Sequence, residues 1–382
     1  MQKEEKNEIT PPPSVSVRTG ILIISGYNSR AVISFCRFAK KEHIDFFIIA
    51  KDNDDNILLS EYKKNVIIIR KDEILSINNF KKWKQLINKE TVVILPSTEY
   101  LNRFILEHRK NLENIGYIIP LCEKKIYNEL SDKYSFSRLC EKHGIQIPSE
   151  YNADLKFPCV AKPKTYSTST GLILKPELLY SEDSYKTFIE NYDANDFYFQ
   201  EFIGGKSIYL LYYFSTDNKV SFFSQENIIQ QDHGLSIIAA VSSERHVGDI
   251  TSNYTKMLTE LNFHGLMMIE IKLYKNRYYT IEANPRLWGP SQLILDSGMD
   301  LFHCFMSDYG LLQSNITNTN YRKGVLYFWS GGIFQDSKNG SKITFNGGYN
   351  QKNFIRDYHR FFSSEIYLRE DTIDIYRSEH RI

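Results

Sequence analysis

A predicted β-hairpin carries the side chains best suited to chemistry in this sequence. The stretch GLMMIEIKLYKNRYYTIEANPRLWGP (265–290) contains two strand patterns, 266–274 and 278–284, joined by a short polar turn at 275–276. In the first strand, the alternate residues from 267 to 273 are all apolar, so this face belongs to the core. The polar side chains of the hairpin must therefore gather on the other face.

Two carboxylates and a carboxamide converge on that face. Glu270 lies there in the first strand, and Glu282 and Asn284 share one face of the second strand because they are two residues apart. An odd-length turn places Glu270 directly opposite Glu282, and an even-length turn places the two diagonally. Arg286 follows just after Pro285 and can reach a charged oxygen beside this cluster.

A divalent metal ion is the ligand that this cluster favours. Carboxylates that face each other across two strands repel, and burying them unpaired costs several kcal/mol. Mg²⁺ takes oxygen ligands of this kind when phosphates complete its coordination, so we expect Glu270, Glu282 and Asn284 to hold Mg²⁺, with Mn²⁺ as an alternative ion. The opposing interpretation is an exposed hairpin in which the glutamates pair with Lys272 or Arg277.

A second candidate segment combines a lysine with a run of hydroxyl groups. The strand pattern at 157–163 places a lysine among apolar residues, and six hydroxyl-bearing residues follow at 165–170. A lysine on an apolar strand needs an anion beside it, and hydroxyl groups donate hydrogen bonds to phosphate oxygens. A simple Ser/Thr-rich turn is the alternative. The residues that we expect to bind phosphate are Lys162, Ser167, Thr168 and Ser169.

These features resemble those of the ATP-grasp superfamily, and come closest to its carboxylate–amine ligases and its carbamoyl-phosphate-synthetase-like branch. The hairpin MIEIKLYKNRYYTIEANPR looks like the family's acidic strand followed by Glu-x-Asn-x-Arg. A predicted helix from Ser131 to His143, with Ser131 as its N-cap and Gly144 after its end, is similar to the family's entry helix. The resemblance implies that Lys133, in the first turn of this helix, contacts nucleotide phosphate.

The remaining site residues rest more heavily on this resemblance. The strand FYFQEFI (197–203) looks like the family's adenine hinge, which implies that Glu201, Phe202 and Ile203 bind the base of ATP. The segment with Arg245 and His246 falls where the acceptor substrate is expected, although an ordinary surface loop explains those two residues equally well. Arg286 would stabilise the transferring phosphoryl group or the acylphosphate.

The sequence before these motifs has an α/β rhythm. Short apolar runs alternate with helical patterns, which predicts a parallel, Rossmann-like sheet ahead of the ATP-grasp core. The turn after the first run contains Gly26 but lacks the Gly-x-Gly-x-x-Gly pattern, and this argues against NAD or FAD binding. The expected strands lie at 21–25, 45–50, 65–70, 91–96 and 116–120, with a helix at 30–41.

The predicted fold class is α/β and α+β, with an ATP-grasp fold preceded by a Rossmann-like domain. The ATP-grasp core at 125–312 divides into an N-terminal lobe (125–200) and a C-terminal lobe (201–312). The C-terminal extension is aromatic enough to fold, and we expect small strands packed on the core, with no function evident. The other predicted regions are a disordered leader (1–18), the Rossmann-like domain (19–124) and the extension (313–382).

Composition narrows the class of protein. The 382 residues are 42% apolar, enough for two or three packed domains. A net charge of +1 without a basic cluster argues against nucleic acid or an anionic membrane as a main partner. The five scattered cysteines suit reduced thiols, and neither a signal peptide nor an apolar run of about 18 residues is evident, so we expect a cytoplasmic protein.

The function implied by the resemblance is ATP-dependent ligation of a small-molecule carboxylate to an amine through an acylphosphate. Other uses of the same fold, namely carboxylation or phosphoryl transfer, are one alternative. A nucleotide-binding module without catalysis is another, although the intact acidic hairpin and Arg286 favour an enzyme. The sequence leaves open whether the protein is a monomer or a homodimer and which acceptor it uses.

Overall fold

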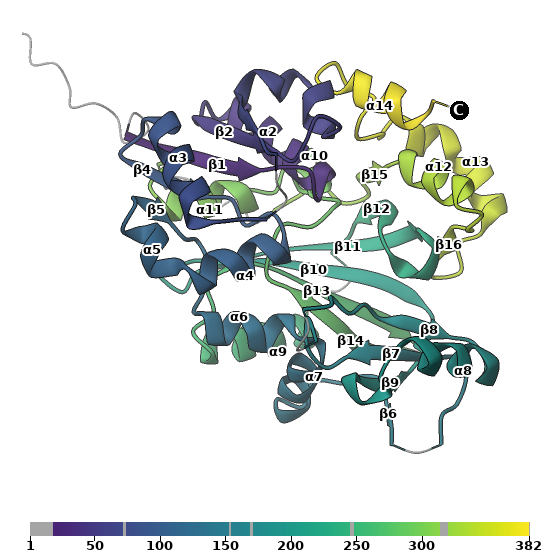
Figure 1. Cartoon of the computed structure of the whole chain (residues 1–382). Helices are drawn as coiled ribbons and strands as arrows, with labels where there is room; N and C mark the ends of the chain where they lie inside the picture. Colours follow the sequence, from purple (N-terminus) through teal and green to yellow (C-terminus); the bar gives the residue numbers. More distant parts are fainter. Residues whose placement is uncertain are drawn as a thin grey trace, which may run out of the picture.

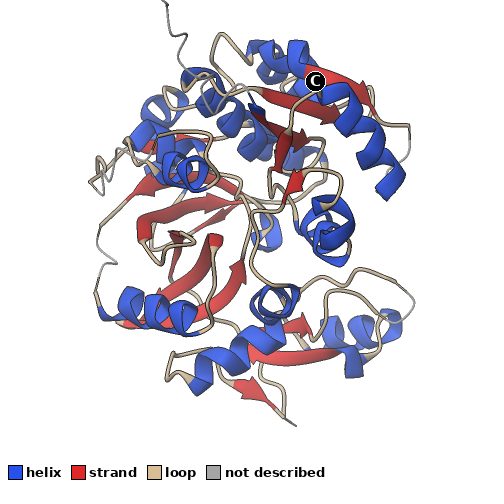
Figure 2. Cartoon of the chain, turned by 90° about the vertical axis from the view of Figure 1, so that its left-hand side faces the viewer, coloured by secondary structure: helices blue, strands red, loops and turns tan. Residues whose placement is uncertain are grey.

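The computed structural model describes residues 18–71, 74–152, 154–168, 171–244, 248–313 and 320–381. Three β-sheets follow one another along the length of the molecule in Figures 1 and 2: an N-terminal sheet at the top, a large sheet in the middle and a small sheet at the bottom. The predicted fold class, a parallel α/β sheet followed by antiparallel sheets, is confirmed.

The N-terminal sheet is parallel and has the strand order β3-β2-β1-β4-β5. Its strands are continuous apolar runs because helices cover both faces: Ile21 and Ile23 pack into one core cluster, and Leu22 and Ile24 into another. The elements are β1 (Thr19–Ile24), α2 (Ser29–Lys41), β2 (Phe46–Ala50), β3 (Val66–Ile69), α3 (Ile77–Ile87), β4 (Thr91–Ile94), α4 (Glu99–Glu107), α5 (Arg109–Glu113) and β5 (Tyr117–Ile118).

Two helices connect this sheet to the small one. They are α6 (Lys124–Ser131) and α7 (Lys133–Lys142), and Gly144 follows α7 with a positive φ of 67°, as predicted. The prediction that Ser131 caps α7 is wrong, because Ser131 is the last residue of α6. Its hydroxyl instead accepts a hydrogen bond from Arg103, which also binds the carboxylate of Asp132.

The small sheet has the strand order β6-β9-β7-β8 and packs its own apolar cluster against α8. In the loop after Lys162, Ser167 and Ile173 form a single β-bridge, and the described residues of the loop form no strand before β8. The elements are β6 (Glu150–Tyr151), β7 (Cys159–Pro163), β8 (Glu177–Leu179), α8 (Glu182–Asn191) and β9 (Phe197–Glu201).

The large sheet has the strand order β14-β13-β10-β11-β12-β15, with β16 added beside β11. The helical segment after the hairpin breaks at Gly298, because this residue takes a positive φ of 79°. The elements are β10 (Lys206–Phe214), β11 (Val220–Gln230), β12 (Ile237–Ser242), α9 (Asp249–Glu260), β13 (Gly265–Tyr274), β14 (Arg277–Asn284), α10 (Gln292–Ser297) and α11 (Leu301–Asp308).

The C-terminal segment (320–381) contains the expected small strands packed on the core, but most of its regular structure is helical, which the sequence did not predict. It contains β15 (Leu326–Phe328), α12 (Gly331–Lys338), β16 (Thr344–Phe345), α13 (Gln351–Phe362) and α14 (Ile373–Glu379). Through β15 it extends the large sheet beside β12, and in Figure 1 α14 lies next to the N-terminal part whereas α12 and α13 lie near β15 and β16. Buried residues of all three parts share one core cluster, for example Phe35, Tyr209 and Tyr367.

Two further observations bear on the sequence predictions. None of the five cysteines forms a disulfide, and four of them are buried. Among the helices of the described segments, none combines the length and the apolar character needed to cross a membrane.

Candidate functional site

The hairpin has an even-length turn, yet its two glutamates are directly opposite. Tyr274 pairs with Arg277, so the turn is the two residues Lys275 and Asn276, both with positive φ as a hairpin turn of this length requires. A β-bulge then skips Ile281 and shifts the register by one residue. As a result Glu270 faces Glu282 across the strands.

The two glutamates have different electrostatic surroundings. Glu270 is 8% exposed; its carboxylate accepts a hydrogen bond from Ser207 (3.0 Å) and lies 3.7 Å from the Lys272 ammonium. Burial raises the pKa of Glu270. Burial opposes charge on Glu282 too, but the Lys133 ammonium at 2.6 Å and a hydrogen bond from Asn284 (2.7 Å) outweigh it and lower the pKa of Glu282 to about 2.

The two lysines predicted to contact phosphate both lie close to this pair. Lys133 begins α7 and forms an ion pair with Glu282, which raises the pKa of Lys133 against the effect of its burial. Lys162 lies in β7, is 5% exposed, and donates to the carbonyl oxygen of the bulged residue Ile281 (2.9 Å). Burial, reinforced by the nearby charge of Lys133, lowers the pKa of Lys162 to about 8.

Arg286 completes the cluster at the end of β14. Its guanidinium donates to the side-chain oxygen of Asn284 (3.2 Å) and to the carbonyl oxygen of Leu287 (2.9 Å). The structure thus brings together six residues predicted from sequence: Lys133, Lys162, Glu270, Glu282, Asn284 and Arg286.

A chain of buried hydrogen bonds fixes Glu270 from behind, and sequence reasoning missed it. The Gln225 amide donates to Asn227 (2.8 Å), Asn227 donates to Ser207 (3.0 Å), and Ser207 donates to Glu270. All four side chains lie on one face of the large sheet, on the neighbouring strands β11, β10 and β13. Their positions, 207, 225, 227 and 270, follow no sequence motif, and only strand pairing brings them together.

The hydroxyl-rich loop and the hinge lie on the small sheet. Ser167 is half-buried, Thr168 accepts a hydrogen bond from the Leu172 main chain, and the prediction for Ser169 falls outside the described residues, as do those for Arg245 and His246. Ile203 is 5% exposed and Phe202 is 42% exposed.

Strand register limits what the hinge glutamate can do. Glu201 pairs with Cys159, so its side chain lies on the opposite face of the small sheet from that of Lys162. The contact to adenine that we predict at the hinge would therefore come from main-chain groups.

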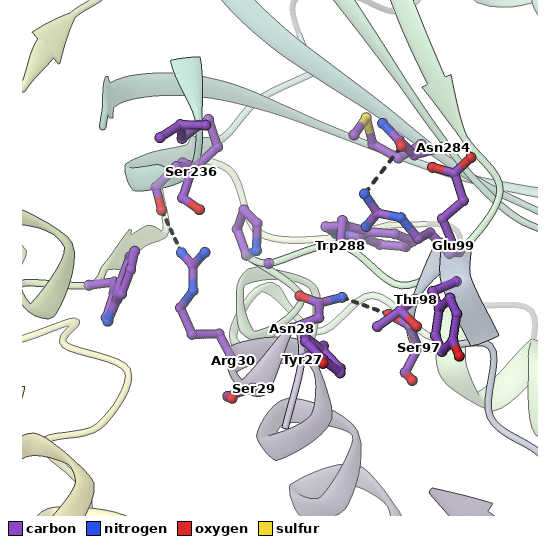
Figure 3. Close-up of a pocket in the computed structure, with 18 of the residues that line it drawn as sticks. Tyr27, Asn28, Ser29, Arg30, Ser97, Thr98, Glu99, Ser236, Asn284 and Trp288 are labelled. Atoms are coloured by element: carbon purple, nitrogen blue, oxygen red, sulfur yellow. Dashed lines mark hydrogen bonds between the residues drawn. The ribbon is translucent and has the colours of Figure 1, made fainter. Parts of the chain in front are cut away.

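A cavity of about 850 Å³ lies beside this cluster and is lined by all three parts of the chain. Figure 3 shows Asn284, Glu99 and Trp288 on one side of it and Arg30 reaching toward Ser236 on the other. Sequence reasoning missed the lining residues outside the motifs, because no local pattern marks them. The charged or aromatic ones in the N-terminal and C-terminal parts are Tyr27, Arg30, Glu99, Tyr100, Trp329, Tyr367 and Glu379.

The donor set fits a magnesium ion better than a transition metal. The described residues contain no cluster of three or more His, Cys, Asp and Glu side chains of the kind that binds a metal by itself. The hairpin instead offers two facing carboxylates and one carboxamide, which are all oxygen donors, at the edge of a large cavity. Such a partial set suits an ion whose coordination is completed by a bound phosphate.

The comparison with known families decides what this domain is. Residues 130–290 match the family model described as the ATP-grasp domain. These residues form an ATP-grasp domain. The match begins at the end of α6 and ends just after Arg286, so it includes all six clustered residues. No curated protein matches the chain.

Solved structures extend the likeness of fold to the N-terminal sheet. Pyruvate carboxylase of Rhizobium etli matches with a TM-score of 0.60 at 13% identity, over 80% of this chain but 30% of that one. A biotin carboxylase of Campylobacter jejuni matches with a TM-score of 0.60 at 13% identity, over 82% and 75% of the two chains. An N5-carboxyaminoimidazole ribonucleotide synthetase bound to ADP matches with a TM-score of 0.60 at 16% identity, over 85% of each. The ATP-grasp domain and the sheet before it therefore share the fold of these enzymes.

Proposed function

We propose that the protein is an ATP-dependent ligase that joins a carboxylate to an amine through an acylphosphate. The paired arrangement of Glu270 and Glu282, with Lys133 and Arg286 beside it and a cavity in front, is the observation that carries this proposal. ATP would bind between the small sheet and the large sheet, with its base at the hinge 201–203. A pure nucleotide sensor has no need of an acidic pair facing a cavity of this size.

The residues of this chain have distinct roles in such a reaction. The γ-phosphoryl group of ATP passes to a carboxylate oxygen and ADP leaves; the amine then attacks the acyl carbon and phosphate leaves. Lys162 and Lys133 would neutralise phosphate oxygens, and Arg286 would stabilise the charge on the transferring group. Glu270, Glu282 and Asn284 would hold Mg²⁺, which supplies charge neutralisation when bound.

Lys133 can contact a nucleotide phosphate only if another cation replaces it beside Glu282. In the structure its ammonium is 2.6 Å from the Glu282 carboxylate. A cation bound at Glu282 would neutralise this carboxylate in place of Lys133, and the Lys133 ammonium would then be available for the nucleotide. We expect Mg²⁺ and nucleotide to bind together for this reason.

The test is ATP turnover that depends on added substrates. Purified protein with Mg²⁺ and ATP is screened against small carboxylates, bicarbonate among them, combined with amino acids and other amines, and ADP release is measured. Release that requires both a carboxylate and an amine supports the ligase, and bicarbonate as the required carboxylate indicates N-carboxylation. Tight nucleotide binding without turnover in any combination would contradict the proposal in favour of a binding module.

A variant links turnover to the hairpin. Glu282→Gln keeps the shape and most hydrogen bonds but removes one negative charge, so turnover should fall about 10³-fold or more while ATP affinity falls much less. Equal turnover in both proteins would overturn the metal assignment.

The substrates that we propose are small molecules, and the compartment that we propose is the cytoplasm. Light scattering would show whether the protein forms a homodimer.

A further inference from the structure

Two opposite charges line the cavity on the side away from the hairpin, and neither has an ion-pair partner among the described residues. Arg30 lies at the start of α2 and Glu379 at the end of α14. In the described part of the chain no carboxylate lies within 4.0 Å of the Arg30 guanidinium, and no cation lies within 4.0 Å of the Glu379 carboxylate. Charges removed from water without a counter-ion are costly. This wall therefore favours a ligand that carries both an anionic and a cationic group.

A single indole ring holds the two charges in place. The Arg30 guanidinium carbon lies over the Trp329 ring, 3.8 Å from its centroid, and the Trp329 Nε1–H donates to the Glu379 carboxylate (3.0 Å). Trp329 is 5% exposed and joins β15 to α12. The cation therefore lies on the face of the ring and the anion at its edge, within reach of one small molecule.

Two glycines leave the space that the Arg30 and Glu379 side chains occupy. A Cβ atom at Gly331 would lie 2.0 Å from the Glu379 carboxylate, and one at Gly289 would lie 3.0 Å from the Arg30 guanidinium. Arg30 also donates to the Ile237 carbonyl oxygen (2.7 Å) and to the Tyr327 hydroxyl (3.2 Å), which leaves Nε and Nη2 without a hydrogen-bond partner among the described residues. These donors remain for a ligand.

We propose that the wall formed by Arg30, Trp329 and Glu379 binds the zwitterionic head group of a free amino acid, with the ligand carboxylate at Arg30 and the ligand ammonium at Glu379. The idea that this amino acid is one of the two substrates rests on the proposed ligase function. The binding itself does not, because it follows from the two unpaired charges. A ligand with one charge alone would leave either Arg30 or Glu379 unmatched.

The source of the two charges explains why this site belongs to the chain as a whole. Arg30 comes from α2 in the N-terminal part, whereas Trp329 and Glu379 come from the C-terminal segment (320–381). The ATP-grasp domain at 130–290 contributes the hairpin on the opposite side of the cavity, and residues 234–237 and Gly289 beside Arg30. The head-group wall is therefore separate from the residues that we assign to nucleotide and metal.

The experiment measures binding of the twenty common L-amino acids to the full chain, in the presence of Mg²⁺ and ADP, by thermal shift and then calorimetry. We expect one or a few to bind. For the best of them, the N-acetyl derivative, which loses the cation, and the α-amide, which loses the anion, should each bind about 10-fold to 100-fold more weakly. Equal binding of all three compounds, or of no amino acid while ADP binds, would overturn the inference.

Two variants assign the two contacts. Glu379→Gln should abolish the discrimination against the N-acetyl derivative alone, and Arg30→Met should abolish the discrimination against the amide alone, whereas a purely structural role would weaken all ligands equally. Glu370→Gln, at an exposed carboxylate of the same segment, is the matched control and should leave the discrimination against both derivatives unchanged. If either variant fails to fold, the binding of the three compounds to the wild-type protein still tests the inference. Amino-acid binding without ADP release in any screen would contradict the ligase function but uphold this site.

Discussion

At the scale of single residues, Glu270 and Glu282 look equivalent in the sequence but differ in the structure. The first is buried with a weak partner, and its pKa is raised; the second has Lys133 and Asn284 as partners, and its pKa is lowered to about 2. Removing the charge should therefore destabilise the ligand-free protein at Glu282 but not at Glu270.

We expect Glu270→Gln to leave the free energy of unfolding unchanged or raise it by about 1 kcal/mol, because a desolvated charge is removed. Glu282→Gln should lower it by about 1–3 kcal/mol, because Lys133 loses its counter-ion. Urea unfolding in EDTA at pH 7.5 measures both. Two losses of the same size would show that the difference between the two environments is misassigned.

Lys162 allows a second prediction at this scale. Lys162→Met keeps the aliphatic stem within β7 but removes the charge, so the dissociation constant for Mg-ATP should rise about 10-fold to 100-fold. Lys164→Met is the control, because Lys164 is exposed on the same segment and its ammonium donates to the Asn195 carbonyl oxygen. Calorimetry with a non-hydrolysable ATP analogue makes the comparison. Unchanged affinity in Lys162→Met would remove Lys162 from the phosphate site.

The sequence predicted the residues whose chemical type is unusual for their position. A lysine on an apolar strand and paired glutamates on a hairpin stand out because each costs energy unless it has a partner. Ser207 and Asn227 did not stand out, since small polar residues on a strand are ordinary. Arg30 and Glu379 are 349 positions apart, and only the folded chain places them around one ring.

At the scale of elements, the sequence left the pairing of the hairpin open between two registers. The two-residue turn alone would have placed the glutamates diagonally, and the bulge at Ile281 restores the direct pairing. A bulge depends on how the strand fits its neighbours, and here Lys162 binds the displaced carbonyl oxygen. That contact comes from another sheet, so the local sequence could not reveal it.

The end of α14 provides a prediction about pH. Burial raises the pKa of Glu379 to about 7, above its ordinary value of 4.5. Between these two values the folded state keeps a proton that the unfolded state has released, so stability falls as the pH rises from 4.5 to 7 and is constant above. The full loss is about 3 kcal/mol.

Glu379→Gln removes this titration. Its melting temperature should exceed that of the wild type at pH 8, and most of the difference should disappear at pH 5. Melting curves at the two pH values, with Glu370→Gln as the control, measure the effect. A wild-type protein that is the more stable one at pH 8 would contradict the burial of an unpaired carboxylate.

At the scale of the whole molecule, one arginine joins three segments. Arg37 of α2 donates to both oxygens of Asp371 (2.8 and 3.0 Å), and its other contacts are to Gln292, Ile366 and Thr372. Asp371 also accepts from Tyr62, and together these contacts lower its pKa against the effect of burial. Arg37 thereby fixes the C-terminal segment against the N-terminal sheet.

Arg37→Met should lower the free energy of unfolding by about 1–3 kcal/mol, because the partly buried Asp371 carboxylate loses its cationic partner. Adding Asp371→Asn should restore part of the loss, which identifies the ion pair rather than lost packing as the cause. Thermal or urea unfolding of the single and double variants gives the coupling. Additive losses would show that the two side chains act independently.

The sequence predicted the order of the sheets well, because apolar runs between helices mark parallel strands directly. For the C-terminal segment the aromatic content suggested small strands, which are present as β15 and β16, but the helices were missed. There Phe354, Tyr358 and Phe361 pack as one face of α13 against Phe328. Aromatic residues favour strands only weakly, and the helical spacing of these three was the better guide.

The distribution of the cavity lining along the chain has a consequence for biosynthesis. The lining begins at Tyr27 and ends at Glu379, whereas the proposed nucleotide and metal residues all lie between 133 and 286. A ribosome adds about 5–20 residues per second and domains fold from the N-terminal side first. The nascent chain therefore contains every proposed nucleotide contact several seconds before Trp329 and Glu379 emerge, and the two halves of the cavity become complete at different times.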